Sequence, residues 1–270
     1  STNRIALAEC TLKIMDRTIS SLDGRPLIIP LSAGNDSRLI VSAAKHLGYQ
    51  NVRCFTYGRE GNYEVAASRV IAEKLGFEWR FVPFTNPILR RFFASEAYKD
   101  YIEFADTCTS VPFVQDMAAI QILKQDGFIP DGAVFANGNS GDFISGAHIP
   151  SQLQRIDNGM PFKERQTRIL NALYDKHFSL WEVLRTAENK DFILASIQAS
   201  LDQANAILRE PEADHGLYEL AEFQDRQCKF VITGQRIYEF LGHEWRMPLW
   251  DRDYLRFWEG VPLNQKAGQS

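Results

Sequence analysis

The chain has 270 residues, of which 45% are hydrophobic and 24% are charged, proportions that are ordinary for a soluble globular protein with one large domain. Its formal net charge of −4, with no long basic run, gives no compositional support for binding to nucleic acid or to an anionic membrane. No apolar run approaches the roughly 20 residues of a membrane span, and the first residues lack the charged start and apolar core of a signal peptide, so we expect a cytoplasmic protein.

The first part of the chain alternates predicted helices and strands. Apolar side chains near helical period predict a helix over residues 4–22. Strands are predicted at 27–31, 52–57 and 79–84, and helices between them at 37–47 and 62–75. This rhythm predicts an α/β fold with a parallel twisted sheet of about five strands and helices on both faces. Ligands of such sheets bind outside the carboxyl ends of the strands.

The rest of the chain is predicted to be mostly helical. Helices are expected at 86–99 and 114–125, a buried strand at 133–136, and a loop at 137–142. Helical patterns dominate from about residue 161, where strand signals vanish. Proline and glycine cluster between residues 150 and 161, so we place a boundary there, between an α/β domain at 1–155 and a helical region at 156–270.

The end of the first predicted strand carries the most informative segment, Leu31-Ser32-Ala33-Gly34-Asn35-Asp36-Ser37. Small residues let the backbone approach an anion closely, and the N–H groups and dipole of the following helix favour negative charge. Asp36 could hold a divalent cation against phosphates. The loop is not a Walker A motif, because no Gly-Lys-Ser/Thr follows. The alternative interpretation is an ordinary turn with Asp36 and Ser37 as helix caps.

Four segments together resemble a known family. Ser32–Ser37 resembles the Ser-Gly-Gly-x-Asp-Ser loop of the N-type ATP pyrophosphatases. Phe55–Gly58 with the helix after it, Asn137–Gly146 and Gly242–Asp251 resemble segments of the synthetase domain of asparagine synthetases, in the same order and at similar spacing. The resemblance covers most of the chain and implies the pyrophosphatase-loop fold with bound ATP and Mg²⁺. It also implies activation of a substrate carboxylate as an acyl-adenylate, with pyrophosphate released, and aminolysis to an amide.

The resemblance also assigns roles to residues. The ATP-binding residues that it implies are Leu31, Ser32, Ala33, Gly34, Asn35, Asp36, Ser37, Thr56, Tyr57, Gly58 and Gly138. It implies that Asp36 and Asp142 share Mg²⁺, which prefers few protein ligands together with phosphate oxygens. Taken alone, Asp142 would be interpreted as a turn residue in a loop rich in Gly, Asn and Ser, and its pairing with Asp36 at the ends of parallel strands is what favours the metal.

The sequence departs from the family pattern at informative positions. Ala33 replaces a glycine and should fit if its φ is negative. Asn139 stands where the family has a glutamate that is a candidate acid or base, and Phe143 replaces a second acidic residue. Because an asparagine cannot exchange a proton at neutral pH, three alternatives remain open. Another group is the base, the amine arrives deprotonated, or the activity is weak.

Towards the C-terminus, Lys266 lies where the family has a lysine that stabilises the acyl-adenylate. Two other interpretations of Lys266 stay open. It could be a non-catalytic lysine, with the catalytic lysine beyond residue 270, or a solvated surface residue. Substrate choice is expected from residues 107–112 and 222–229. The second segment carries Glu222 and other charged residues at helical spacing, so it also fits a solvated helix face.

The partners expected by resemblance are a small carboxylate substrate and an amine or ammonia donor. Asparagine synthetases carry an N-terminal glutaminase domain that starts with a nucleophilic cysteine, whereas this chain starts Ser1-Thr2-Asn3. The amine source would then be free ammonia, a separate glutaminase chain or domain, or the amine of a second substrate. Amidation of a sugar acid in surface polysaccharide synthesis is a related role.

Two alternative functions stay open: another N-type pyrophosphatase, or a catalytically weak nucleotide-binding partner protein. A thiol-transfer enzyme or a structural zinc site has little support, because the cysteines are widely spaced and form no Cys-x-x-Cys pair.

Overall fold

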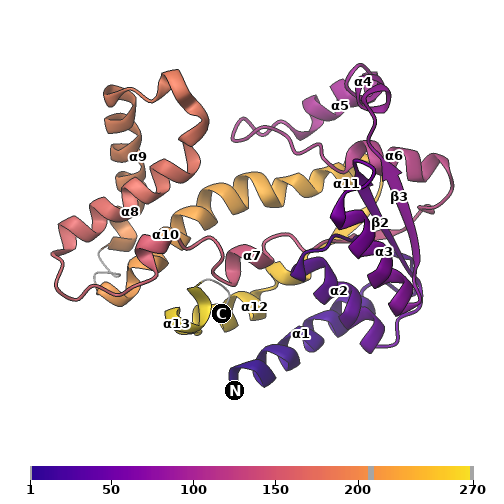
Figure 1. The fold of residues 1–270 in the computed structure, drawn as a ribbon, viewed down its shortest axis with the longest axis horizontal. Helices are drawn as coiled ribbons and strands as arrows, with labels where there is room; N and C mark the ends of the chain where they lie inside the picture. The colour runs from indigo at the N-terminus through magenta and orange to yellow at the C-terminus, as the bar shows by residue number, and fades with distance from the viewer. Residues whose placement is uncertain (1, 206–209, 268–270) are drawn as a thin grey trace. The chain divides into compact units, whose positions relative to one another are not determined.

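The computed structural model describes residues 2–205 and 210–267, which form two compact units (Figure 1). The first unit comprises Ser1–Gly141 with Phe230–Gly260, and the second comprises Asp142–Lys229 with Val261–Ser270. The chain therefore leaves the first unit at Gly141 and returns to it at Phe230. In the described residues, no helix is both long enough and apolar enough to cross a membrane.

The first unit is built on a five-stranded sheet in the order β3-β2-β1-β4-β5. Its strands are β1 (Leu27–Pro30), β2 (Val52–Gly58), β3 (Glu78–Pro83), β4 (Val134–Ala136) and β5 (Glu244–Arg246). Every neighbouring pair is parallel, with Leu27 of β1 opposite Val52 of β2 and Val134 of β4. This confirms the predicted parallel sheet of about five strands.

Helices cover both faces of this sheet. The helices of the first unit are α1 (Thr2–Ser20), α2 (Asn35–His46), α3 (Tyr63–Leu75), α4 (Asn86–Phe93), α5 (Glu96–Ala105), α6 (Met117–Gln125), α11 (Arg236–Phe240) and α12 (Arg252–Glu259), with 3₁₀ turns η5 (Thr233–Gln235) and η6 (Pro248–Trp250). Ile28 points to a core shared with α5, α6 and α11, while α2 and α3 pack against the other face. Because β1 is buried on both faces, its sequence is a continuous apolar run rather than an alternating one.

Two elements differ from the sequence prediction. The helix expected over 86–99 is broken into α4 and α5, because the Ser95 hydroxyl accepts from the Tyr98 N–H at 3.2 Å and starts a new helix. Strand β5 lies in a segment where no strand was expected. Its three residues pair in register with β4, Val134 opposite Glu244, so the pairing rather than local preference makes it a strand.

The second unit is helical, as expected for the C-terminal part. It contains α8 (Phe162–His177), α9 (Ala187–Asn205), α10 (Asp214–Glu222) and α13 (Leu263–Lys266), with 3₁₀ turns η1 (Ser151–Leu153), η2 (Ser179–Leu184) and η3 (Pro211–Ala213). The short helix α7 (Gly141–Ile144) starts at the unit boundary, and the π-helical η4 (Phe223–Ile232) crosses back over it. An apolar core packs α8, α9 and α10 together around residues such as Leu173 and Tyr218.

Candidate functional site

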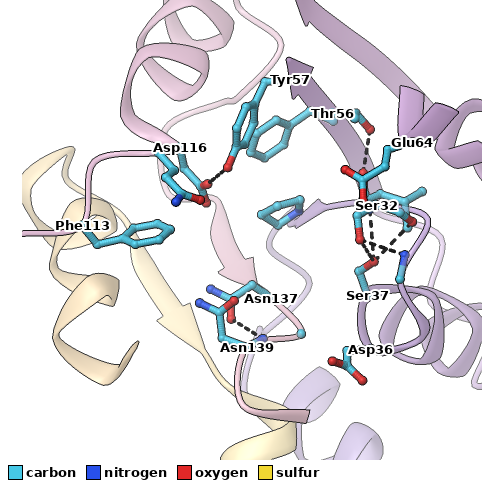
Figure 2. A pocket seen from close by; sticks show the side chains of 16 residues that line it. Ser32, Asp36, Ser37, Thr56, Tyr57, Glu64, Phe113, Asp116, Asn137 and Asn139 are labelled. Atoms are coloured by element: carbon cyan, nitrogen blue, oxygen red, sulfur yellow. Dashed lines mark hydrogen bonds between the residues drawn. The ribbon is translucent and has the colours of Figure 1, made fainter. Parts of the chain in front are cut away.

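A cavity of about 410 Å³ opens at the carboxyl ends of β1, β2 and β4 in the first unit (Figure 2). Eight of the predicted nucleotide-binding residues line it: Leu31, Ser32, Gly34, Asp36, Ser37, Thr56, Tyr57 and Gly138. The predicted residues Ala33, Asn35 and Gly58 do not line it. Asn139 also lines the cavity, so the loop after β4 contributes to the same site as the loop after β1.

In the loop after β1, two serine hydroxyls accept hydrogen bonds from the loop's own backbone. The Ser32 N–H donates to Ser37 Oγ, and the Gly34 N–H donates to Ser32 Oγ, both at 3.1 Å. The N-cap of α2 is Gly34, and no side chain caps the helix, so the interpretation of Asp36 and Ser37 as caps is wrong. An uncapped helix N-terminus at a strand end favours an anion. Ala33 does not have a positive φ. An alanine can therefore stand at this position, where the family has a glycine, without backbone strain.

Two glycines let the loop after β4 pack against Asp36. A Cβ at Gly138 would lie 2.7 Å from both Asp36 Cβ and the Ser37 backbone nitrogen. A Cβ at Gly141 would lie 2.6 Å from the Cγ and Oδ1 atoms of Asp36. Real Cβ atoms do not approach other atoms this closely, so these positions need glycine for contact between the two loops.

The cavity carries acidic but no basic side chains. Asp36, Glu64 and Asp116 are among its lining residues, and none of the residues that line it is Lys, Arg or His. A polyphosphate in this cavity would therefore meet backbone N–H groups and hydroxyls, and its charge would need a cation from outside the lining. Among the described residues, no group of three or more His, Cys, Asp or Glu could hold a metal ion.

Asp116 is a site residue that the sequence analysis missed. It lies directly before α6 and is 7% exposed. Its Oδ1 accepts from the Tyr57 hydroxyl at 2.6 Å, and its Oδ2 accepts from the Tyr238 hydroxyl at 2.8 Å. Burial raises the pKa of Asp116, although both tyrosine hydrogen bonds act to lower it. Its partners lie 59 and 122 residues away in the chain, so no local pattern could have indicated this cluster.

The segment expected to choose the substrate, residues 107–112, lies close in the chain to residues that line this cavity but does not itself line it. None of residues 107–112 lines the cavity, whereas Phe113, Gln115 and Asp116 do. Figure 2 shows Phe113 and Asp116 on the side of the cavity away from Asp36. Asn137, at the end of β4, is a further lining residue that the strand-end rule could have indicated.

The predicted metal ligand Asp142 lies in the second unit, where it contacts a buried network. His148 Nε2 lies 3.2 Å from Asp142 Oδ2, and His148 Nδ1 lies 2.7 Å from Glu222 Oε2. Glu222 also forms an ion pair with His177, and its side chain is fully buried. The interpretation of Glu222 as part of a solvated helix face is therefore wrong. A hydrogen bond from His148 is the main cause that lowers the pKa of Asp142.

Lys266 is also in the second unit and is buried rather than on the surface. Its Nζ lies 2.7 Å from Glu219 Oε1, and its side chain is 7% exposed. Gly146, with φ +90°, packs against it, since a Cβ there would lie 2.5 Å from the Lys266 carbonyl oxygen. The interpretation of Lys266 as a solvated surface residue is therefore wrong, and its catalytic role stays a prediction.

A family model described as asparagine synthase matches residues 20–269. The chain belongs to the asparagine synthase family. Over 146 residues it is 30% identical to a protein of Acanthamoeba polyphaga mimivirus named probable asparagine synthetase [glutamine-hydrolyzing]. That match covers 53% of this chain and 25% of the viral protein, so the chain spans only a part of its relative.

Asparagine synthase domains form a family of ATP-dependent carbon–nitrogen ligases. The cavity of the first unit fits the polyphosphate that this family uses, because the uncapped start of α2 and the serine hydroxyls of the β1 loop face it. Its acidic lining fits a cation beside the phosphates, and Asp36 is the carboxylate at the helix N-terminus. The site therefore fits the family's nucleotide.

Proposed function

We propose that this chain is an amide-forming ligase of the asparagine synthetase type. A carboxylate oxygen of the substrate attacks the α-phosphorus of ATP, the bond from that phosphorus to the bridging oxygen breaks, and pyrophosphate leaves. An amine then attacks the acyl carbon, the bond to AMP breaks, and a proton is released as the amide forms. The observation that carries this proposal is the uncapped N-terminus of α2, which opens with Asp36 into a cavity that has no basic lining residue.

The chain's own residues would divide the work as follows. The first N–H groups of α2, with the hydroxyls of Ser32 and Ser37, bind the departing pyrophosphate. The end of β2, residues 56–58, receives the adenine. Asp36 and Asp142 are the proposed ligands of Mg²⁺, which would neutralise charge on the leaving group. Lys266 is the proposed group that stabilises the acyl-adenylate.

The products of turnover test the reaction class. Chromatography of a mixture with ATP and a substrate carboxylate should show AMP and pyrophosphate, because no Walker lysine is present to hold a transferring γ-phosphate. ADP and phosphate as main products would contradict the assignment. A carboxylate-dependent ATP–pyrophosphate exchange assay over a panel of acids would identify the substrate class.

Calorimetry of Mg²⁺–ATP binding tests Asp36. The Asp36→Asn variant should lose affinity by about tenfold or more in Mg²⁺, because one carboxylate ligand is removed. The matched control is Asp16→Asn, which removes the same charge from an exposed position on α1 and should bind as the wild type does. Equal affinity before and after Asp36→Asn would remove Asp36 as a ligand.

Asn139 favours a second candidate function, nucleotide binding with little turnover. It lines the cavity but cannot exchange a proton, and its backbone N–H donates to Asn137 Oδ1 at 3.2 Å. The pH profile of Asn139→Glu distinguishes the two. If residue 139 is at the acid–base position, the new carboxylate should add an ionisation or change the rate markedly. An unchanged profile, with full activity in Asn139→Ala, would place residue 139 outside the chemistry.

A further inference from the structure

Asp116 is a buried carboxylate whose hydrogen-bonding partners are neutral. It is 7% exposed, and each of its oxygens accepts from a tyrosine hydroxyl. Among the described residues, no Lys, Arg or His forms an ion pair with it, and no basic residue acts on its pKa. An ionised group buried without an opposite charge is costly, so a positively charged ligand would complete this arrangement.

The direction of the hydrogen bonds favours the ionised form of Asp116. The Asn139 N–H donates to Asn137 Oδ1 at 3.2 Å, which orients the amide so that Asn137 Nδ2 faces Tyr238. Asn137 Nδ2 donates to the Tyr238 oxygen at 3.2 Å, and Tyr238 is left to donate its own hydrogen to Asp116. Tyr57 donates to the other oxygen of Asp116. Donors on both oxygens stabilise the anion and lower the pKa of Asp116, which opposes the rise that burial causes, and a cationic ligand would favour the anion further.

Asp116 also lies away from the phosphate end of the cavity. Figure 2 shows it across the cavity from Asp36, Ser32 and Ser37, with the ring of Phe113 beside it. Two ends of one cavity therefore offer different chemistry. The α2 end offers N–H and hydroxyl donors to an anion, and the Asp116 end offers a buried anion to a donor.

We propose that Asp116 binds the protonated primary amino group of an organic substrate. The inference rests on the proposed ligase function, since an amide-forming enzyme holds an amine, or an acid that itself carries one, beside its nucleotide. The ammonium donates to the free lone pairs of the Asp116 carboxylate, while Tyr57 and Tyr238 keep that carboxylate in place. Asp116 is thus a residue that determines substrate specificity.

The test compares ligands that differ by one amino group. Calorimetry is run at pH 7 with aspartate against succinate, and with ethylamine against ethanol, in the presence of Mg²⁺ and α,β-methylene-ATP, which resists cleavage between its α and β phosphates. The wild type should bind the amine-bearing member of at least one pair about tenfold more tightly, the effect of one charge-assisted hydrogen bond. The Asp116→Asn variant should bind both members of that pair equally, with unchanged affinity for the nucleotide.

Two further variants keep the test decisive. Asp126→Asn removes the same charge from an exposed position at the other end of α6 and should retain the wild-type preference. Tyr238→Phe removes one donor to Asp116 and should reduce the preference by less than Asp116→Asn does. It carries the test if Asp116→Asn does not fold.

Three results would overturn the proposal. They are a wild type without preference in any pair, a preference that survives in the folded Asp116→Asn variant or is undiminished in Tyr238→Phe, and weaker nucleotide binding by Asp116→Asn with the preference intact. The last result would assign Asp116 to the adenine. Failure of the proposed function is a different observation, because it is read from ADP formation or absent pyrophosphate exchange and does not alter these binding measurements.

Discussion

The buried carboxylates of the two units differ in the charge of their partners. In the first unit Asp116 accepts from two neutral phenols and faces a cavity. In the second unit the buried carboxylate of Asp214 lies 3.1 Å from Arg165 Nη1 and 3.2 Å from Arg168 Nη2, and buried Glu222 contacts two histidines. A carboxylate already neutralised inside its own unit contributes to folding, whereas one held only by phenols can still neutralise a ligand. Asp214 and Glu222 are therefore structural charges, whereas Asp116 is the charge that we propose binds a ligand.

The largest expected effect comes from breaking the Asp214 cluster. Asp214→Ala leaves two guanidinium groups without their carboxylate, and we expect it to destabilise the second unit by about 3–5 kcal/mol. Hydrogen exchange of α8 and α10 amides measures this locally. The matched control is Asp175→Ala, which removes the exposed partner of Arg185 and should cost about 1 kcal/mol or less. Equal effects of the two variants would contradict the structural role of Asp214.

The Glu222 cluster should give the second unit a stability maximum in mildly acid solution. Burial raises the pKa of Glu222, but hydrogen bonds from His148 and His177 outweigh it and lower the pKa from 4.5 to about 2. This stabilisation is present above pH 4.5 and is lost as the pH falls towards 2. Burial lowers the pKa of His148, but Asp142 and Glu222 raise it overall, so its contribution is present below pH 6.5 and is lost above its raised pKa.

Hydrogen exchange of the second unit at pH 3, 5.5 and 8.5 measures both limbs of this profile. Between pH 5.5 and pH 3 we expect the free energy of unfolding of the second unit to fall by roughly 2–3 kcal/mol. This value is the lowered pKa of Glu222 converted to free energy. Glu222→Gln should flatten the dependence on pH. Stability that keeps rising from pH 5.5 to 8.5 would show that the His148 contacts do not stabilise the fold.

A steric change tests the cavity of the first unit. Gly138→Ala would place a Cβ 2.7 Å from the Ser37 backbone nitrogen, so the loops must separate, at a cost of about 1–3 kcal/mol. We expect weaker Mg²⁺–ATP binding by calorimetry together with a lower melting temperature. The control, Gly216→Ala in α10, has open space around its Cβ and should be neutral or stabilise by up to about 1 kcal/mol. Unchanged nucleotide affinity in Gly138→Ala would show that this close approach does not shape the site.

The smallest effect is expected at the surface of the first unit. Arg17 bridges Asp251 and Asp253 at 2.9 Å, but its side chain is 44% exposed. Because solvent and salt screen such a pair, Arg17→Ala should leave thermal unfolding close to that of the wild type, with little dependence on salt. A large loss would mean that the first unit also depends on ion pairs, and the contrast between the units would disappear.

Local patterns were sufficient for four of the five strands of the sheet in the first unit, but not for β5. The apolar run before Ser32 and the periodic segments after it determined a parallel sheet, and therefore placed the loop of Asp36 and Ser37 at a strand end. The glycine after β4 that this loop needs, Gly138, was also indicated, by its position in the family pattern. These features depend on residues near in the chain or on an ordered set of short segments.

Only the tertiary structure decided which charges are buried and what they meet. Helical spacing made Glu222 look like part of a solvated face, yet His148 and His177 come from elsewhere in the second unit and bury it. Asp116 carried no signal, because Tyr57 and Tyr238 reach it from distant segments of the first unit. Periodicity reports which side of an element is apolar, whereas the partner of a buried charge depends on packing between distant segments, which sequence spacing does not encode.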